Sequence, residues 1–146
     1  MITGIDTAAA IVVRRGTKIE APLERVWDLH TDVNSWPSWQ SDITAAGLEG
    51  PLAPGSVFHW KTAGLSIDST VYAMEAPGRI LWGGTAHGIT GIHLWTFAEE
   101  DGVVHAHTEE SWDGEPVRAD VENLRAALDG SLAAWLDHLK KAAESA

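Results

Sequence analysis

The chain has 146 residues, of which 45% are hydrophobic and 21% charged, as is ordinary for a soluble globular protein, and we expect residues 1–146 to form a single domain. Its formal net charge of -11 disfavours nucleic acid and anionic membrane surfaces as partners, because both are bound through positive charge; a neutral or cationic ligand fits better. The absence of cysteine excludes disulfides and thiolate chemistry. No apolar run approaches the about 20 residues of a membrane span, and the N-terminus lacks a basic signal-peptide cluster, so we expect no membrane insertion and a cytoplasmic location.

The first third of the chain predicts one strand followed by two short helices. After a loose terminus over residues 1–7, residues 10–20 alternate β-branched and polar side chains as a strand does. Pro22 begins a short helix, and Asp32 is suited to cap a second one. The first helix runs through Leu23, Val26, Trp27 and His30, and the second carries Val33, Trp36 and Trp39.

Six apolar runs at short spacing follow, each closed by turn residues, which indicates an antiparallel meander. The Asp101-Gly102 dipeptide is the strongest hairpin signal in the chain. The glycine-rich stretch 83–91 lacks the spacing and the lysine of a phosphate loop, so we expect it to bend a strand or to leave room for a ligand. The predicted strands cover residues 43–46, 57–62, 65–76, 80–86, 91–98 and 103–112.

Residues 116–143 predict one long helix with a single buried face. Apolar residues recur three, four or seven positions apart, and charged residues take the other side. Pro116 suits the first helical position, and Asp113 or Glu115 supplies negative charge near the N-terminus. Such a helix is roughly 40 Å long, so it needs a sheet to cover it. The apolar face comprises Val117, Val121, Leu124, Leu128, Leu132, Trp135, Leu136 and Leu139.

These elements predict an α+β fold in which an antiparallel sheet, with two short helices after its first strand, curves around a long C-terminal helix. Six segments also carry a family resemblance: residues 19–27, Thr31-Asp32-Val33, Trp36-Pro37-Ser38-Trp39, and residues 54–58, 79–82 and 132–144. They resemble the START/Bet v 1-like (SRPBCC) superfamily, in particular its polyketide cyclase/dehydrase-like bacterial members. This resemblance implies a helix-grip fold with a large apolar cavity between sheet and helix.

Tryptophan is unusually frequent, with eight residues against one tyrosine and two phenylalanines. Core packing explains any single tryptophan, but the set favours a ligand surface, because an indole offers a broad apolar wall and one N–H donor. Alternation along two strands places Phe58 with Trp60, and Ile80 with Trp82, on faces that we take as inward. The predicted ligand-binding residues are Trp36, Trp39, Phe58, Trp60, Val71, Ile80, Trp82, Trp95, Phe97, Thr108, Trp112, Val121, Leu124 and Leu128.

The hairpin at Asp101-Gly102 predicts a pair of ionisable side chains. A two-residue turn pairs Glu100 with Val103, and counting back along both strands sets His93 opposite Glu110. Alternation places the pair on the more aromatic face, which we take as the inner one. Directly opposed residues have Cβ atoms about 4.5–5.5 Å apart, close enough for imidazole and carboxylate to hydrogen-bond. We therefore predict a catalytic acid–base pair, with a purely structural ion pair as the alternative.

Two other polar patterns are weaker. His105, His107 and Glu109 project from one strand face, but no fourth ligand is evident, so we expect the solvent side of the sheet, no metal and no cofactor. The resembled aromatase/cyclases are thought to use arginine, serine and tyrosine inside the cavity. Here Tyr72 is the only tyrosine, so that set cannot be transferred to this chain.

Two functions follow for an apolar cavity with one ionisable pair. The first is binding of a hydrophobic, aromatic or polyketide-like small molecule, with cyclisation or dehydration by acid–base chemistry. The alternative is a non-catalytic carrier of a hydrophobic ligand or lipid. A protein-interaction module would need an exposed apolar patch, which the sequence does not show. We expect a monomer or a homodimer.

Overall fold

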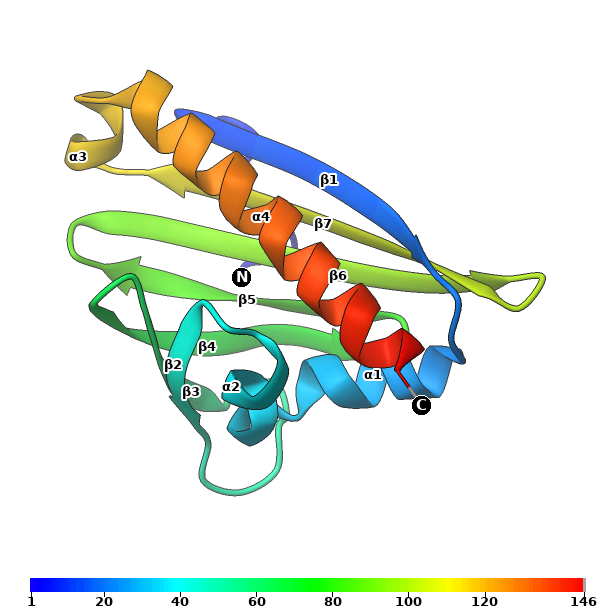
Figure 1. Ribbon diagram of the computed structural model, residues 1–146. Coiled ribbons are helices and arrows are strands. Elements are labelled where there is room, and N and C mark those ends of the chain that lie inside the picture. The colour runs from blue at the N-terminus through cyan, green and yellow to red at the C-terminus, as the bar shows by residue number, and fades with distance from the viewer. Residues whose placement is uncertain (146) are drawn as a thin grey trace.

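The computed structural model describes residues 1–145, which form one curved antiparallel sheet and a long helix packed across it. The strand order is β1-β7-β6-β5-β4-β3-β2, so the first and last strands are neighbours. The helix α4 runs diagonally over the sheet, with the short helices α1 and α2 beside its C-terminal half (Figure 1). The predicted α+β helix-grip architecture is confirmed.

The predicted strands are all present, each within a few residues of its expected bounds. The strands are β1 (Ile11–Ile19), β2 (Ile43–Gly47), β3 (Val57–Thr62), β4 (Leu65–Glu75), β5 (Arg79–Ala86), β6 (Ile89–Glu100) and β7 (Val103–Asp113). The helices are α1 (Leu23–Thr31), the 3-10 helix η1 (Val33–Ser35), α2 (Trp36–Trp39), α3 (Glu115–Arg118) and α4 (Val121–Glu144).

Three hairpin turns have positive φ at both central residues: Ala63-Gly64, His87-Gly88 and Asp101-Gly102. Turns of this kind match the right-handed twist of the flanking strands. The third turn sets the register of β6 against β7, and His93 lies opposite Glu110 as predicted. The second turn falls inside the glycine-rich stretch, which therefore contains a hairpin as well as the end of one strand and the start of the next.

The long C-terminal helix begins later than predicted. Pro116 lies in the first turn of α3, a separate helix of four residues. The chain then leaves the helical conformation at Asp120, which has a φ of -152°, and the carbonyl of Asp120 accepts the N–H of Leu124 to begin α4. Aspartate favours the N-cap position over a helix interior, so Asp120 was the residue in the sequence that indicated a break between α3 and α4. None of the described helices has both the length and the apolarity needed to cross a bilayer.

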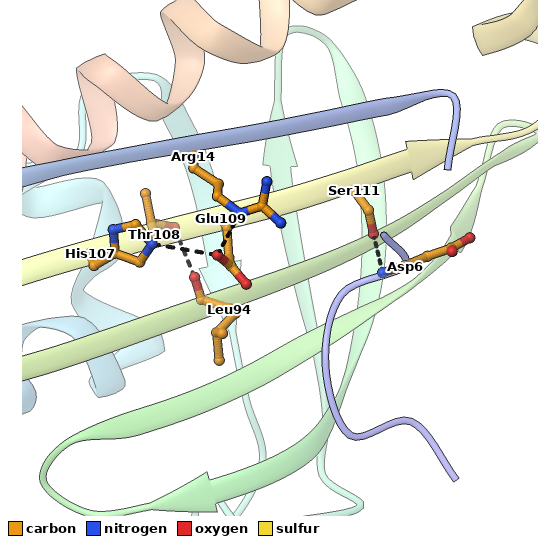
Figure 2. A network of polar contacts seen from close by, with 7 residues as sticks. All are labelled: Asp6, Arg14, Leu94, His107, Thr108, Glu109 and Ser111. Carbon is orange, nitrogen blue, oxygen red and sulfur yellow. Dashed lines mark hydrogen bonds and ion pairs between the residues drawn. The ribbon is translucent and has the colours of Figure 1, made fainter. Parts of the chain in front are cut away.

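The N-terminal segment is anchored to the convex face of the sheet, so the prediction of a loose terminus is wrong. The backbone N–H of Asp6 donates to Oγ of Ser111 at 3.0 Å (Figure 2). Arg79 donates to the carbonyl of Thr3 at 2.8 Å. Ile92, directly opposite Ser111, is only 8% exposed although it faces away from α4.

The main core lies between the concave face of the sheet and the helices α1, α2 and α4. The predicted inward face of α4 is confirmed at Leu128 and Trp135, which are buried. Val121 and Leu124, in the first turn of the helix, are half-buried and pack against the edge of this core. The buried residues of α4 are Leu128, Leu132, Trp135, Leu136, Leu139 and Ala143.

Candidate functional site

His93 and Glu110 form a pair in close contact on the concave face of the sheet. The Nδ1 of His93 lies 3.1 Å from Oε1 of Glu110, and the two side chains are 3% and 15% exposed. They come from adjacent strands, β6 and β7, at positions directly opposite each other. The predicted contact is thus confirmed, whereas the catalytic role assigned to it stays a prediction.

The hydrogen bonds around His93 identify which ring nitrogen carries a proton. The hydroxyl of Thr108 donates to the carbonyl of Leu94 at 3.0 Å (Figure 2). Because a hydroxyl has one proton, the 2.7 Å contact of Thr108 with Nε2 of His93 requires Nε2–H to be the donor. In a neutral imidazole Nδ1 is then an acceptor. The protonated carboxyl of Glu110 can donate to it.

Burial favours this neutral form of the pair. It raises the pKa of the Glu110 carboxyl from 4.5 to about 8, although the hydrogen bond from the indole of Trp112 opposes the shift. Burial also lowers the pKa of His93 well below its ordinary value, and the positive charge that His30 can carry lowers it further. At neutral pH the pair is therefore a carboxylic acid next to an imidazole base, the combination needed for proton transfer to and from a ligand.

Two glycines keep β5 and β6 close together beside this pair. A Cβ on Gly83 would overlap the carbonyl oxygen of Gly91, so the backbone approach there requires glycine. A Cβ on Gly91 would lie 3.4 Å from the indole of Trp112 and 3.5 Å from Oε2 of Glu110. Because residue 91 has no side chain, it does not cover Oε2 of Glu110. The expectation that this glycine-rich stretch leaves room for a ligand stays a prediction.

Aromatic side chains converge on the concave side of the pair. The ring of Trp82 lies 4.7 Å and that of Trp95 5.2 Å from the imidazole of His93. Trp135 of α4 lies 5.6 Å from Trp95, and Trp36 of α2 lies 5.1 Å from Trp135. We call the following residues the aromatic cluster: Trp36, Phe58, Trp60, Trp82, Trp95, Phe97 and Trp135.

The aromatic cluster occupies the space that we expected to be an open apolar cavity. Trp36 and Trp95 are fully buried, and the ring of Trp36 contacts Phe58, Trp60, Trp82 and Trp135. Two hollows in the described surface, of about 660 and 420 Å³, lie outside the cluster, beside α1 and between β1 and α4. Indole rings are large enough to fill such a space. A ligand can therefore enter it only if some of these rings move.

The remaining predicted ligand-binding residues surround the aromatic cluster at different depths. Val71, Ile80 and Thr108 are buried, and Val71 lies opposite Trp82 in the sheet. The ring of Trp39 lies 6.0 Å from that of Trp135, at the outer side of the cluster. Trp112 lies beside Glu110 near the end of β7, and Val121, Leu124 and Leu128 lie in the N-terminal part of α4.

His30 is a polar residue of this interior to which the sequence analysis assigned no site role. It is 1% exposed, and neither ring nitrogen has a hydrogen-bond partner. Its ring lies 4.6 Å from that of Trp95, and burial lowers its pKa to about 3. The signal was its helical spacing, because His30 is four residues after Val26 and three after Trp27, both buried.

The His105, His107 and Glu109 side chains lie on the convex face, opposite the aromatic cluster. Oε2 of Glu109 accepts the Nε–H of Arg14 at 3.1 Å and lies 3.4 Å from Nε2 of His107 (Figure 2). Within residues 1–145 no group of three or more histidine, aspartate or glutamate side chains is arranged to hold a metal ion. The interpretation of this stripe as the solvent side of the sheet is confirmed.

A curved antiparallel sheet around a long C-terminal helix is also the fold of solved proteins of the START superfamily. A START superfamily protein from Mycobacterium smegmatis superposes with a TM-score of 0.74 at 12% identity, over 91% of this chain and 97% of the other. The ZhuI aromatase/cyclase from Streptomyces sp. R1128 superposes with a TM-score of 0.79 at 17% identity, over 91% and 93%. At these identities both comparisons establish the fold alone.

Comparison of the sequence, unlike that of the fold, assigns the chain to a family. Residues 10–144 match the model of the family described as polyketide cyclase / dehydrase and lipid transport, and the chain belongs to that family. The oxopyrrolidines biosynthesis cluster protein O of Penicillium oxalicum is 28% identical, over 68% of this chain and 61% of the fungal protein. The chain thus matches less than two thirds of the length of that relative.

Proposed function

We propose that the protein binds a flat, hydrophobic, polyketide-like molecule within the aromatic cluster and that Glu110 and His93 catalyse its dehydration or cyclisation. The observation that carries this proposal is the buried contact of Glu110 with His93, in which a carboxylic acid and an imidazole are both neutral at pH 7. Membership of the polyketide cyclase / dehydrase and lipid transport family supports the choice of ligand class.

The pair suits the loss of water from a β-hydroxy ketone. Glu110 donates its proton to the leaving hydroxyl, which departs as water, while Nδ1 of His93 accepts the proton from the carbon between the two oxygen-bearing carbons. The C–O and C–H bonds break, and a carbon–carbon double bond forms. Transfer of the proton from Nδ1 to the Glu110 carboxylate restores the starting state. The Nε2–H bond to Thr108 keeps the ring oriented during both transfers.

Access to the pair requires movement of α2. This helix has only four residues, and its Trp36 and Trp39 rings contact Trp135 of α4 at 5.1 and 6.0 Å. Outward displacement of α2 removes Trp36 from Trp82, which leaves a flat ligand room to stack on Trp82, the ring that lies 4.7 Å from His93. Stacking against indole rings replaces the contacts that the cluster loses.

The test uses a β-hydroxy ketone with a naphthyl group on the hydroxyl-bearing carbon, because loss of water gives a conjugated enone that is followed by absorbance. We expect turnover by the wild-type protein and a loss of about 100-fold or more in kcat for His93→Ala and Glu110→Gln. Glu109→Gln is the matched control, since Glu109 is on the same strand but on the opposite face. Equal turnover in the three variants would contradict the catalytic roles.

A non-catalytic carrier is the second candidate. It is favoured by the observation that both oxygens of Glu110 already have partners within the protein, His93 and Trp112, as expected of a structural pair. The family description also includes lipid transport. Tight binding of the naphthyl ketone without any enone formation would support the carrier over the enzyme.

A further inference from the structure

The two ring nitrogens of His30 are unpaired inside an apolar interior. His30 is 1% exposed and its Nδ1 and Nε2 have no hydrogen-bond partner. Burying a polar group without a partner costs free energy, and native proteins rarely leave such groups unsatisfied. A phenylalanine or leucine would fill the same space without that cost. The histidine therefore needs an explanation other than packing.

The surroundings of His30 connect it to the proposed site. The rings of Trp95 and Trp135 lie 4.6 and 6.1 Å from that of His30, and 5.2 and 6.5 Å from that of His93. The two imidazoles thus flank the same two indoles. The N–H of Trp95 is also buried without a partner. Unused hydrogen-bonding groups therefore gather beside the proton-transfer pair.

Movement of α2 would uncover His30 as well as Trp82. Trp36 packs 6.1 Å from the His30 ring, and its indole N–H donates to the His30 backbone carbonyl at 2.8 Å. The residue that must move to admit a ligand is thus also the residue that covers His30. A ligand in the place of the Trp36 ring would contact His30 directly.

We propose that His30 is a specificity-determining residue that hydrogen-bonds a hydroxyl group of the bound aromatic molecule. Burial keeps the imidazole neutral, so one ring nitrogen donates and the other accepts. A hydroxyl group can use either role, whereas the indole N–H groups nearby can only donate. This inference rests on the proposed function, because it requires a ligand in the aromatic cluster, but it does not depend on catalysis.

The test compares 2-naphthol with 2-methylnaphthalene, which differ by a hydroxyl in place of a methyl group. The quantity measured by equilibrium dialysis is the ratio of their affinities, in the wild type and in His30→Phe. We expect the variant to lose about tenfold in this ratio, with the affinity for 2-methylnaphthalene retained. His105→Phe, an exposed histidine on the convex face, is the control and should keep the wild-type ratio.

The outcomes separate this inference from the proposed function. If the wild type binds neither probe, the proposed function and the role of His30 both fail. If both proteins bind both probes with the same ratio, only the role of His30 fails. A second measurement needs no variant: in wild-type protein with ¹⁵N-labelled histidine, 2-naphthol should shift the His30 ring resonances and 2-methylnaphthalene should not. If 2-naphthol left the His30 ring resonances unchanged, the proposal would be overturned. That result is expected if a buried water already bonds the ring nitrogens of His30.

Discussion

The indole N–H of Trp112 donates to Oε2 of Glu110 at 2.7 Å, from a position two residues further along the same strand. Alternation in β7 places both side chains on one face, so the bond fixes the orientation of the carboxyl group. With Oε2 held by the indole, Oε1 is the oxygen directed at Nδ1 of His93. Trp112 thus positions Glu110 for proton transfer to His93.

Trp112→Phe should raise the pKa of Glu110 above about 8, because the indole bond is the contribution that lowers it. Burial remains in the variant and continues to favour the neutral carboxyl. Titration of the Glu110 carboxyl carbon by NMR measures the change. An unchanged or lower pKa would show that the indole does not stabilise the charged carboxylate.

Glu110→Gln should remove a loss of stability that accumulates as the pH rises from about 4.5 to about 8. The pKa of Glu110 is raised in the folded protein from 4.5 to about 8, so the folded state holds a proton that the unfolded state releases. Ionisation of Glu110 therefore lowers the free energy of unfolding of the wild type between about pH 4.5 and pH 8, by at most about 1.4 kcal/mol per pH unit. Above about pH 8 this contribution levels off. The glutamine variant lacks this slope.

Urea unfolding at pH 5, 6.5 and 8 measures the predicted difference between Glu110→Gln and the wild type. The stability of the variant relative to the wild type should increase with pH across this range. Glu109→Gln, on the exposed face, should show no such trend. A difference between Glu110→Gln and the wild type that is constant with pH would mean that Glu110 ionises normally in the folded protein.

Leu128→Ala should destabilise the fold by about 2–5 kcal/mol, because it leaves a cavity in the interface of α4 with the sheet. Leu128 is 1% exposed and is the first of the buried residues along α4. Glu122→Ala is the control, because Glu122 is exposed on the first turn of the same helix. Thermal unfolding followed by circular dichroism compares them, and an unchanged midpoint for Leu128→Ala would argue against α4 as the central packing element.

The sequence was sufficient to predict residue contacts in the candidate site wherever short-range rules determine the geometry. The turn at Asp101-Gly102 fixes the register of two strands, and the contact of His93 with Glu110 follows from counting residues. Which nitrogen of the His93 ring carries the proton does not follow from counting residues. It depends on the hydroxyl of Thr108, whose donation to the carbonyl of Leu94 is visible only in three dimensions.

Features that depend on distant contacts or on rotamers were not predictable. The N-terminal segment docks through a bond between Asp6 and Ser111, 105 residues apart, and no local pattern indicates it. The packing of the aromatic cluster into a filled interior depends on the combined orientation of its rings. Alternation identified the inward faces of Phe58 and Trp82, but it cannot tell a closed interior from an open cavity.

Binding of a flat ligand within the aromatic cluster should quench tryptophan fluorescence, with 1,4-naphthoquinone as the probe. The quinone is an efficient electron acceptor, and the chain has no cysteine to react with it. Trp82→Phe and Trp95→Phe should each weaken the apparent affinity, because both rings contact His93 where the ligand is proposed to stack. Acrylamide is the control, since it quenches exposed indoles and should leave these buried ones largely unaffected. The expected result is saturable quenching by the quinone in the wild type, with a weaker apparent affinity in both variants. Quenching that only increases linearly with quinone concentration would indicate collisions at the surface and would count against a ligand site in the aromatic cluster.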